Sequence, residues 1–86
     1  MIRQEQIAMV FATMHQTMEA EECLEQGDIP VQWLNVPADL GLGCGMALGV
    51  EKDADALSLL KSAGIKPRSL WKITGESWHP FFKETR

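Results

Sequence analysis

The sequence predicts an α+β protein in which two helices cover one face of a four-stranded antiparallel sheet. Short apolar segments of strand length alternate with two amphipathic helical segments in the order strand, helix, strand, strand, helix, strand. Two Gly-x-x-Pro segments, at 27–30 and 64–67, repeat with an offset of 37 residues (64 minus 27), and the same apolar spacing follows each. The two βαβ halves predict a ferredoxin-like βαββαβ sandwich. We place this domain at residues 1–75 of the 86 and an aromatic C-terminal tail at 76–86.

The first half is predicted to hold two strands and one helix. Residues 7–12 (IAMVFA) are an apolar run typical of a buried strand, and Thr13 is a suitable N-cap for a helix over about 14–26. Gly27 ends this helix. Residues 31–36 (VQWLNV) form the second predicted strand, and Pro37 closes it because proline supplies no backbone donor. The helix stripe that we expect to be buried consists of Met14, Thr17, Ala20, Glu21 and Leu24.

The second half repeats this order. Residues 46–50 alternate large and small side chains, as a strand with one large-residue face does. Asp53 is the expected N-cap of a helix over 54–63, and Gly64 the expected residue after its end. Residues 69–73 (SLWKI) form the fourth strand, and the remaining segment carries the tail aromatics Trp78, Phe81 and Phe82.

Strand parity predicts what lies on each face of the sheet. We expect the helices to cover Leu34, Val36, Trp71 and Ile73, and the open face to carry Val31, Trp33 and Leu70 beside small residues such as Ala47 and Gly49. An apolar open face needs cover. Either the aromatic tail or a second subunit is expected to supply it, and the second case would make the protein a homodimer.

Composition excludes several classes of protein. Lys and Arg number 8 against 12 Asp and Glu, which gives a net charge of −4 and no basic cluster for nucleic acid or an anionic membrane. No signal peptide or transmembrane segment fits the chain. Its two cysteines are too few for a disulfide framework, so we expect a cytoplasmic protein with reduced thiols. No cofactor is expected.

The segment most suited to chemistry is Gly41-Leu42-Gly43-Cys44-Gly45, in the turn that leads into the third strand. Three glycines allow successive backbone amides to point into one concavity, which would favour a thiolate and hold the pKa of Cys44 below its usual value of about 8.5. The alternative is a small buried hydrophobe, because Cys44 shares the parity of Met46 and Leu48. The segment is no dinucleotide-binding loop, since Met46 stands where the last glycine would be.

Two further residues are candidates near this segment. His15, in the first helical turn, is expected at the same end of the sheet as Cys44, where it could act as an assisting base. Neither His15 nor His79 has metal ligands at suitable spacing, so no metal site is expected. Glu21 lies on the predicted buried stripe and must reach a donor or the surface, so we expect it to buttress the loop after the second strand. Cys23 has no glycine or cation beside it and is predicted to be structural or incidental.

Between Ile7 and Ile73, the chain resembles a small bacterial family of selenium/sulfur carrier protein-like domains. The most specific part is the stretch from Pro37 to Leu48, with a proline that leaves the second strand and the pair Cys44-Gly45 that opens the third. Thr13 and His15 at the helix start, and Ala20-Glu21 within the helix, are similar too. The chain departs from the family at Gly41-Leu42-Gly43, where small polar residues are usual. The resemblance implies that Cys44 carries sulfur or selenium between donor and acceptor proteins.

These observations lead to two hypotheses about function. In the first, Cys44 holds a persulfide or selenopersulfide, activated by loop amides and by His15, in a loop that Pro37, Gly41, Gly43 and Gly45 shape. In the second, the chain is a non-catalytic module for small-molecule sensing or protein interaction, which dimerises through its open sheet face, and Cys44 only packs. The reactivity of Cys44 relative to Cys23 distinguishes the two.

Overall fold

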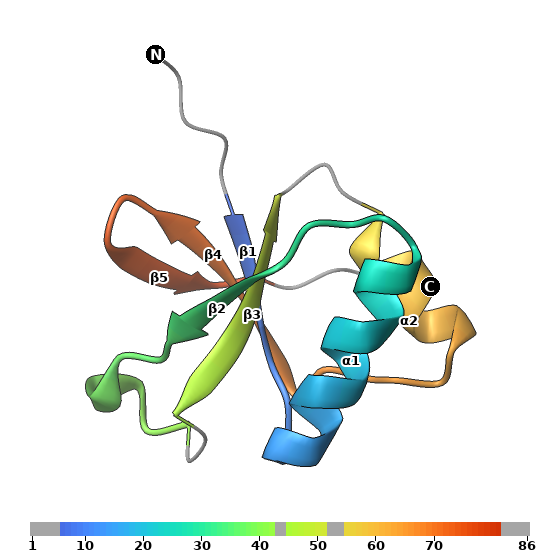
Figure 1. Cartoon of the computed structure of the whole chain (residues 1–86). Coiled ribbons are helices and arrows are strands. Elements are labelled where there is room, and N and C mark those ends of the chain that lie inside the picture. The colour runs from blue at the N-terminus through green and yellow to red at the C-terminus, as the bar shows by residue number, and fades with distance from the viewer. Residues whose placement is uncertain (1–5, 43–44, 52–54, 82–86) are drawn as a thin grey trace.

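The computed structural model describes residues 6–42, 45–51 and 55–81 of the chain. Figure 1 shows one sheet with both helices on the same side of it. The elements in chain order are β1 (Gln6–Val10), α1 (Met14–Gln26), β2 (Gln32–Asn35), a short 3-10 helix η1 (Ala38–Leu40), β3 (Met46–Glu51), α2 (Ala56–Ser62), β4 (Ser69–Thr74) and β5 (Ser77–Pro80). The α+β class is therefore confirmed.

The sheet has the strand order β2-β3-β1-β4-β5, and all neighbouring strands are antiparallel. β1 lies at the centre, where Ala8 is opposite Gly49 of β3 on one side and Trp71 of β4 on the other. The predicted count of four strands is wrong. Residues 77–80, expected in the tail, pair with β4 as a fifth strand, with Thr74 opposite Ser77. A two-residue turn at Gly75-Glu76 joins β4 to β5, and Gly75 has the positive φ (63°) that such turns require at their first position.

The first helix agrees with its prediction because its capping residues specify both ends. Thr13 is the N-cap, and its hydroxyl accepts a hydrogen bond from the backbone N–H of Gln16 at 3.1 Å. The backbone N–H of Gly27 at the other end donates to the last turn. Thr17, Ala20 and Leu24 are buried as expected, whereas Met14 is 46% exposed, which contradicts its place on the predicted stripe. Met14 lies in the first helical turn, where α1 has only just left the sheet.

The second helix runs from Ala56 to Ser62, so the predicted start at residue 54 is wrong. Asp55 occupies the N-cap position in place of Asp53, which lies outside the described residues. Its end follows the predicted pattern. Gly64 has a φ of 77°, and the backbone N–H of Ile65 donates to the carbonyl of Leu60 at 2.9 Å. This bond belongs to the Schellman ending, which satisfies the last free carbonyls of a helix.

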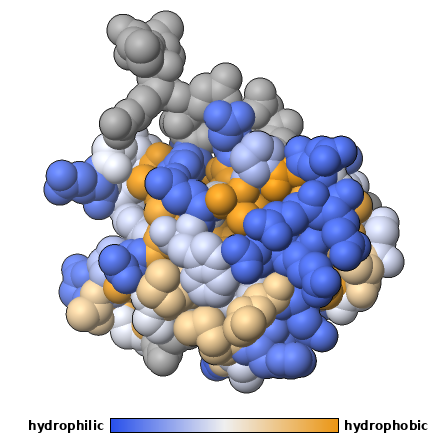
Figure 2. All heavy atoms as spheres, in the orientation of Figure 1, coloured by the Kyte–Doolittle hydropathy of each residue, from blue (hydrophilic) through white to orange (hydrophobic). Residues whose placement is uncertain are grey.

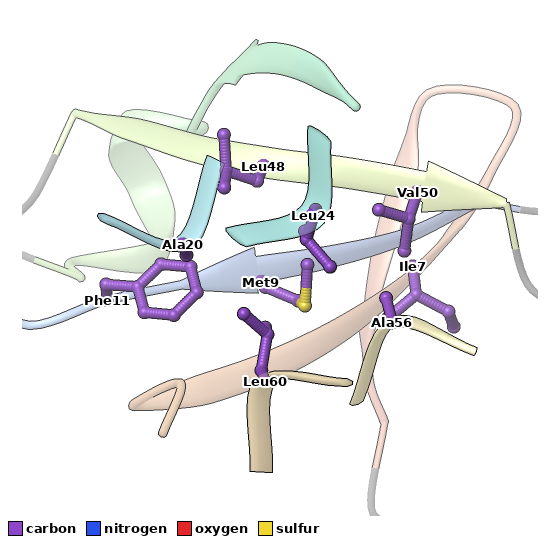
Figure 3. Packing of buried hydrophobic residues seen from close by; sticks show 9 residues of the cluster. All are labelled: Ile7, Met9, Phe11, Ala20, Leu24, Leu48, Val50, Ala56 and Leu60. Atoms are coloured by element: carbon purple, nitrogen blue, oxygen red, sulfur yellow. The ribbon is translucent and has the colours of Figure 1, made fainter. Parts of the chain in front are cut away.

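The main core lies between the sheet and the two helices. Figure 3 shows Met9 at its centre, with the side chains of Leu24 and Leu60 directed toward it from the two helices. The cluster of buried side chains consists of Ile7, Met9, Phe11, Ala20, Leu24, Leu48, Val50, Ala56 and Leu60. A methyl group at Gly27 would collide with the side chain of Leu59, so the glycine permits the close approach of α1 and α2.

The prediction of which residues face the helices is wrong for β2 and β4. Trp33 and Leu70, expected on the open face, pack against the core beneath the helices together with Val31. The residues expected there, Leu34, Val36, Trp71 and Ile73, lie on the opposite face around Ala8, Val10 and Ala47. The register of β2 on β3 decides which face Trp33 occupies, because Leu48 of β3 belongs to the helix side and Trp33 is its direct partner. The expectation for Ala47 agrees with the structure, since this residue lies on the open side.

Candidate functional site

The candidate loop joins β2 to β3 and is closed at its base by a backbone hydrogen bond. The N–H of Val36 donates to the carbonyl of Gly45 at 3.0 Å. Pro37, with an extended backbone (φ −57°, ψ 132°), directs the chain away from β2 into η1. The N–H of Leu40 then donates to the carbonyl of Pro37 at 3.1 Å. The loop is thus built by a proline that cannot continue the strand and by a short turn that reverses the chain.

The glycines of this loop have different conformations. Gly41 ends η1 with a φ of 63°, a left-handed conformation that favours glycine. Gly45 has no such φ, and a methyl group at either position would meet nothing within 4 Å. Both glycines are exposed. Gly43 lies outside the described residues. Backbone conformation therefore accounts for glycine at position 41, whereas open space would accommodate a side chain at position 45.

Cys44, the candidate carrier residue, also lies outside the described residues. The residues on either side of the undescribed pair are placed. Leu42 is half-buried and packs against the apolar cluster on the open face, and Gly45 is exposed directly before β3. Sequence analysis did not assign Leu42 a role. Leu42 is a large apolar residue between two glycines, and this pattern is the feature of the sequence that could have indicated an anchoring role. The loop is thereby anchored to the sheet two residues before the cysteine.

Cys23, the other cysteine, is engaged within the fold. It is half-buried in α1, and its Sγ lies 4.0 Å from the carbonyl oxygen of Leu59. It also packs against the main core. A thiol is a weak donor, so this contact contributes little energy, but it orients Sγ toward the second helix. This position is consistent with a structural cysteine.

His15 lies in the first turn of α1 and is 83% exposed. Its Nε2 is 3.6 Å from Oε2 of Glu19, one turn further along the same helix. β3 runs antiparallel to β1, with Met9 opposite Leu48, so β3 begins at the end of the sheet where β1 stops. In Figure 1, α1 also begins at that end. His15 and Gly45 thus share one end of the molecule, and the approach of His15 to the thiol of Cys44 stays a prediction.

Glu21 links α1 to the sheet. Its Oε2 accepts a hydrogen bond from the indole Nε1 of Trp33 at 2.6 Å. Both residues are half-buried, and a bond to an ionised acceptor is stronger than one between neutral groups. The partner lies in β2 itself, three residues before Val36 at the base of the loop. The sequence pattern does not predict this pair, because strand parity places Trp33 on the open face. That Glu21 also orders the loop stays a prediction.

Other features of the described part of the chain bear on metal binding, on pockets and on membrane insertion. Among residues 6–42, 45–51 and 55–81, no group of three or more His, Cys, Asp or Glu side chains could hold a metal ion. A hollow of about 360 Å³ lies at the opposite end from the candidate loop, lined by Gly27, Ile29, Asp55, Ser58, Leu59 and Ser62. Neither described helix is sufficiently long and apolar to cross a membrane.

Comparison with known proteins identifies a family. A family model described as "Putative Se/S carrier protein-like" matches residues 6–72. The matched region runs from the first residue of β1 into β4 and includes both cysteines, the candidate loop and α1. No curated protein and no solved structure matches the chain significantly.

Proposed function

The chain belongs to the family described as "Putative Se/S carrier protein-like", and from this premise we propose that it carries a sulfur or selenium atom on Cys44. The single observation that supports this choice is the contrast between the two cysteines. Cys23 is half-buried, with its thiol against the carbonyl of Leu59. Cys44 directly precedes Gly45, which is exposed at the end of the sheet. A partner protein can approach this end of the molecule.

The proposed transfer is an exchange between a thiolate and a persulfide. The Cys44 thiolate attacks the outer sulfur of a donor persulfide, R–S–SH, and forms a new S–S bond. The S–S bond of the donor breaks, and R–S⁻ leaves with the electron pair and takes up a proton from solvent. Cys44 then holds S–SH, which an acceptor thiolate attacks in the same way. Neither step needs an external oxidant or reductant, because the electron pair of the broken S–S bond leaves with the departing thiolate. With selenium, the atom attacked and transferred is the outer selenium of a selenopersulfide.

The described residues near the loop have supporting roles in this proposal. Pro37 and the left-handed Gly41 shape the approach to the cysteine, and Leu42 anchors it to the sheet. His15 is assigned the uptake of the thiol proton, since it is exposed and lies at the same end of the molecule as Gly45. No substrate pocket is needed, because the transferred atom moves directly between sulfur atoms of two proteins.

Two single-cysteine variants test the proposal. The folded Cys23→Ser and Cys44→Ser proteins are treated at neutral pH with glutathione persulfide and then analysed by intact mass. We expect Cys23→Ser, which keeps Cys44, to gain one sulfur atom and to react with iodoacetamide much faster than Cys44→Ser. In addition, His15→Gln should slow labelling of Cys44 at neutral pH, whereas Met18→Gln on the same helix should not. Equal adducts on both cysteine variants, or an unreactive Cys44, would overturn the proposal.

A second candidate is a non-catalytic interaction module, and the apolar open face of the sheet favours it. Six half-buried apolar side chains lie there on the side away from the helices. In this case Cys44 packs and does not react. A concentration-dependent mass together with an unreactive Cys44 would select the module over the carrier. A dimeric protein with a reactive Cys44 would show that the carrier also associates.

We infer further that β1 to β4 and the two helices form a ferredoxin-like unit to which β5 is added. Support comes from the strand order β2-β3-β1-β4, from its antiparallel pairs and from the two helices on one side. An experimental structure in which these elements superpose on a ferredoxin-like domain tests this inference. A reducing compartment such as the cytoplasm suits a thiol carrier, and we propose this location on that ground alone.

A further inference from the structure

The face of the sheet away from the helices, which we call the open face, is apolar. Three of its residues, Ala8, Val10 and Ala47, are fully buried. They are surrounded by six half-buried apolar side chains, those of Leu34, Val36, Leu42, Trp71, Ile73 and Trp78. No helix of the described residues covers this side in Figure 1. Contiguous apolar surface of this kind marks an interaction site in a folded protein.

The open face has small residues in its central strands and large ones in its flanking strands. Ala47 and Gly49 of β3 lie beside Ala8 of β1, whereas Trp71 of β4 stands on one side and Leu34 of β2 on the other. A methyl group at Gly49 would collide with the side chain of Leu34, so the leucine lies across the glycine. The large flanking side chains thus cover the small central residues and form the outer surface of this face.

The two tryptophans of the open face are arranged for apolar contact. Trp71 and Trp78 have ring centroids 6.5 Å apart at an interplanar angle of 53°. The indole N–H of Trp71 donates to the hydroxyl of Ser69 at 3.0 Å, so this polar group already has a partner within the chain. Gln6 and Gln32, at one end of the face, are hydrogen-bonded to each other at 2.9 Å. Burial against an apolar surface leaves the bond of the Trp71 indole intact, whereas the two glutamine amides at the end of the face have further polar atoms that favour a position at the solvent-exposed rim.

Charge is almost absent from the open face. Among the described strand residues that point to this side, the charged one is Glu51, at the end of β3. The helix side differs, since α1 alone carries four glutamates and no lysine or arginine. Figure 2 shows hydrophilic residues gathered on the right of the molecule, where the helices lie in Figure 1. Among the described residues, the four glutamates of α1 therefore lie on the side of the sheet away from the open face.

We propose that the open face binds a second copy of the chain, which makes the protein a symmetric dimer. Two chains of net charge −4 repel each other, so self-association is favoured where the contact surface carries least charge. A strongly charged partner would leave its charges unpaired against this face, at a desolvation cost. A two-fold axis brings the same apolar patch of both copies together and turns both α1 helices outward. The proposal is independent of any chemistry at Cys44.

The size of the open face indicates a weak dimer. Five strands about 4.8 Å apart and about five residues long give a face of roughly 24 Å by 17 Å, or about 400 Å² in projection. The relief of the side chains adds to this area. A surface of that size lies at the lower end of specific interfaces, where complexes are transient. We therefore expect dissociation in the micromolar range.

Sedimentation of the full chain over a range of concentrations tests the proposal. We expect the average mass to rise from that of one 9.6 kDa chain toward twice that value between about 5 and about 500 µM. The variants Ile73→Lys and Val36→Lys place a cation on the two sides of the face and should weaken association at least about tenfold. Met18→Lys is the matched control, because Met18 is 56% exposed on α1. All three changes make the net charge less negative, so added repulsion cannot explain a loss of association.

Circular dichroism of each variant establishes that it is folded, and two variants on opposite sides of the face keep the test valid if one fails to fold. A wild-type chain that stays monomeric at the highest concentration would overturn the proposal. So would folded Ile73→Lys and Val36→Lys proteins that associate as the wild type does, or a Met18→Lys protein that dissociates equally. Assemblies that grow beyond two chains would exclude the two-fold contact. Labelling of Cys44 in the Ile73→Lys protein, whose substitution lies outside the candidate loop, tests the carrier proposal separately.

Discussion

Asp28 and Gly64 occupy the same position at the ends of the two helices but have different conformational costs. Asp28 has a φ of 61° and Gly64 a φ of 77°, both in the left-handed region. After each, an isoleucine N–H returns to the last helical turn, from Ile29 to Leu24 and from Ile65 to Leu60, both at 2.9 Å. The left-handed conformation is costly for a residue with a Cβ and free of that cost for glycine. Asp28 also places a negative charge at the negative end of α1.

We therefore expect Asp28→Gly to stabilise the protein by about 0.5 to 1 kcal/mol. Asp28→Asn, which removes the charge and keeps a Cβ, should give a smaller gain. Gly64→Ala, the matched change in the opposite direction, should destabilise the protein by about 1 kcal/mol. Urea unfolding followed by circular dichroism measures all three. An Asp28→Gly protein less stable than the wild type would show that Asp28 makes a compensating interaction.

Asp28 and Gly64 also show which features of the fold the sequence repeat predicts and which it does not. The Gly-x-x-Pro repeat aligns Gly27 with Gly64, but the structure matches Asp28 with Gly64, one residue out of step. The strands keep the predicted offset, since Trp33 and Leu70 face the same side of the sheet. The connection from Gly64 to Leu70 is one residue longer than the connection from Asp28 to Trp33. This extra residue explains why the helix ends differ by one position while the strands keep the offset. The sequence contains the repeat, but a single inserted residue is not visible until the hydrogen bonds are known.

Among the site residues, Glu21 shows why some partners are beyond sequence analysis. Its place on the helix stripe predicts that its carboxylate needs a donor, and the Trp33 indole supplies one at 2.6 Å. The donor lies twelve residues away on a strand whose two faces are both apolar. The need for a partner is a local property that the helix period reveals. The identity of the partner depends on strand register, which is a long-range property.

At the scale of elements, both ends of α1 and the C-terminal end of α2 were predictable, whereas the start of α2 and the strand faces were not. Thr13, Gly27 and Gly64 act on their immediate neighbours, so local chemistry specifies where α1 and α2 end. β2 and β4 carry large apolar residues on both sides, because Trp33 and Leu34 are consecutive, as are Leu70 and Trp71. Parity within such a strand predicts two alternating sets but does not say which is buried. The buried set is decided by the pairing of β2 with β3 and of β4 with β1.

β5 was missed for a related reason. The segment from Ser77 to Pro80 is short and polar, with one large apolar side chain, so its composition does not indicate a strand. The signal was the two-residue interval Gly75-Glu76 directly after a strand, which is typical of a tight hairpin with glycine first. The hairpin places Trp78 beside Trp71 and adds it to the open face.

Replacement of Gly75 tests how much the hairpin depends on its turn. Gly75 and Gly45 are both open, with nothing within 4 Å of an added methyl group, but only Gly75 has a positive φ. Gly75→Ala should therefore cost about 1 to 2 kcal/mol of stability. Gly45→Ala, the control, should be neutral or slightly stabilising, because it restricts the unfolded chain. Urea unfolding compares the two, and hydrogen exchange of the Phe81 amide, which donates to Leu70 at 2.9 Å, reports on β5. Equal effects of both changes would contradict a strained turn.

At the scale of the whole molecule, the acidic helix α1 and the apolar open face lie on opposite sides of the sheet in the described part of the chain. Residues 4–51 contain no lysine or arginine, and four of their acidic residues are in α1. The open face carries the aromatic and aliphatic side chains that the helices do not cover. The candidate loop lies at the end of the sheet, where β2 leads into β3. The open face and the candidate loop adjoin at Leu42, which belongs to both, whereas Gly45 is exposed at the sheet end.

This segregation predicts how salt affects association. Two chains of charge −4 whose charge centres lie about 25 Å apart repel by about 1 kcal/mol at about 10 mM salt and by about a tenth of that at about 150 mM. The proposed contact is apolar and contains no attractive ion pairs for salt to screen. Salt therefore screens only the repulsion between the two chains. The association constant should accordingly rise about fivefold over this range, because about 1 kcal/mol of repulsion is removed. Sedimentation at the two salt concentrations measures the change, with Ile73→Lys as the non-associating control. Weaker association at the higher salt concentration would mean that charged groups hold the two chains together and that they meet through a surface other than the open face.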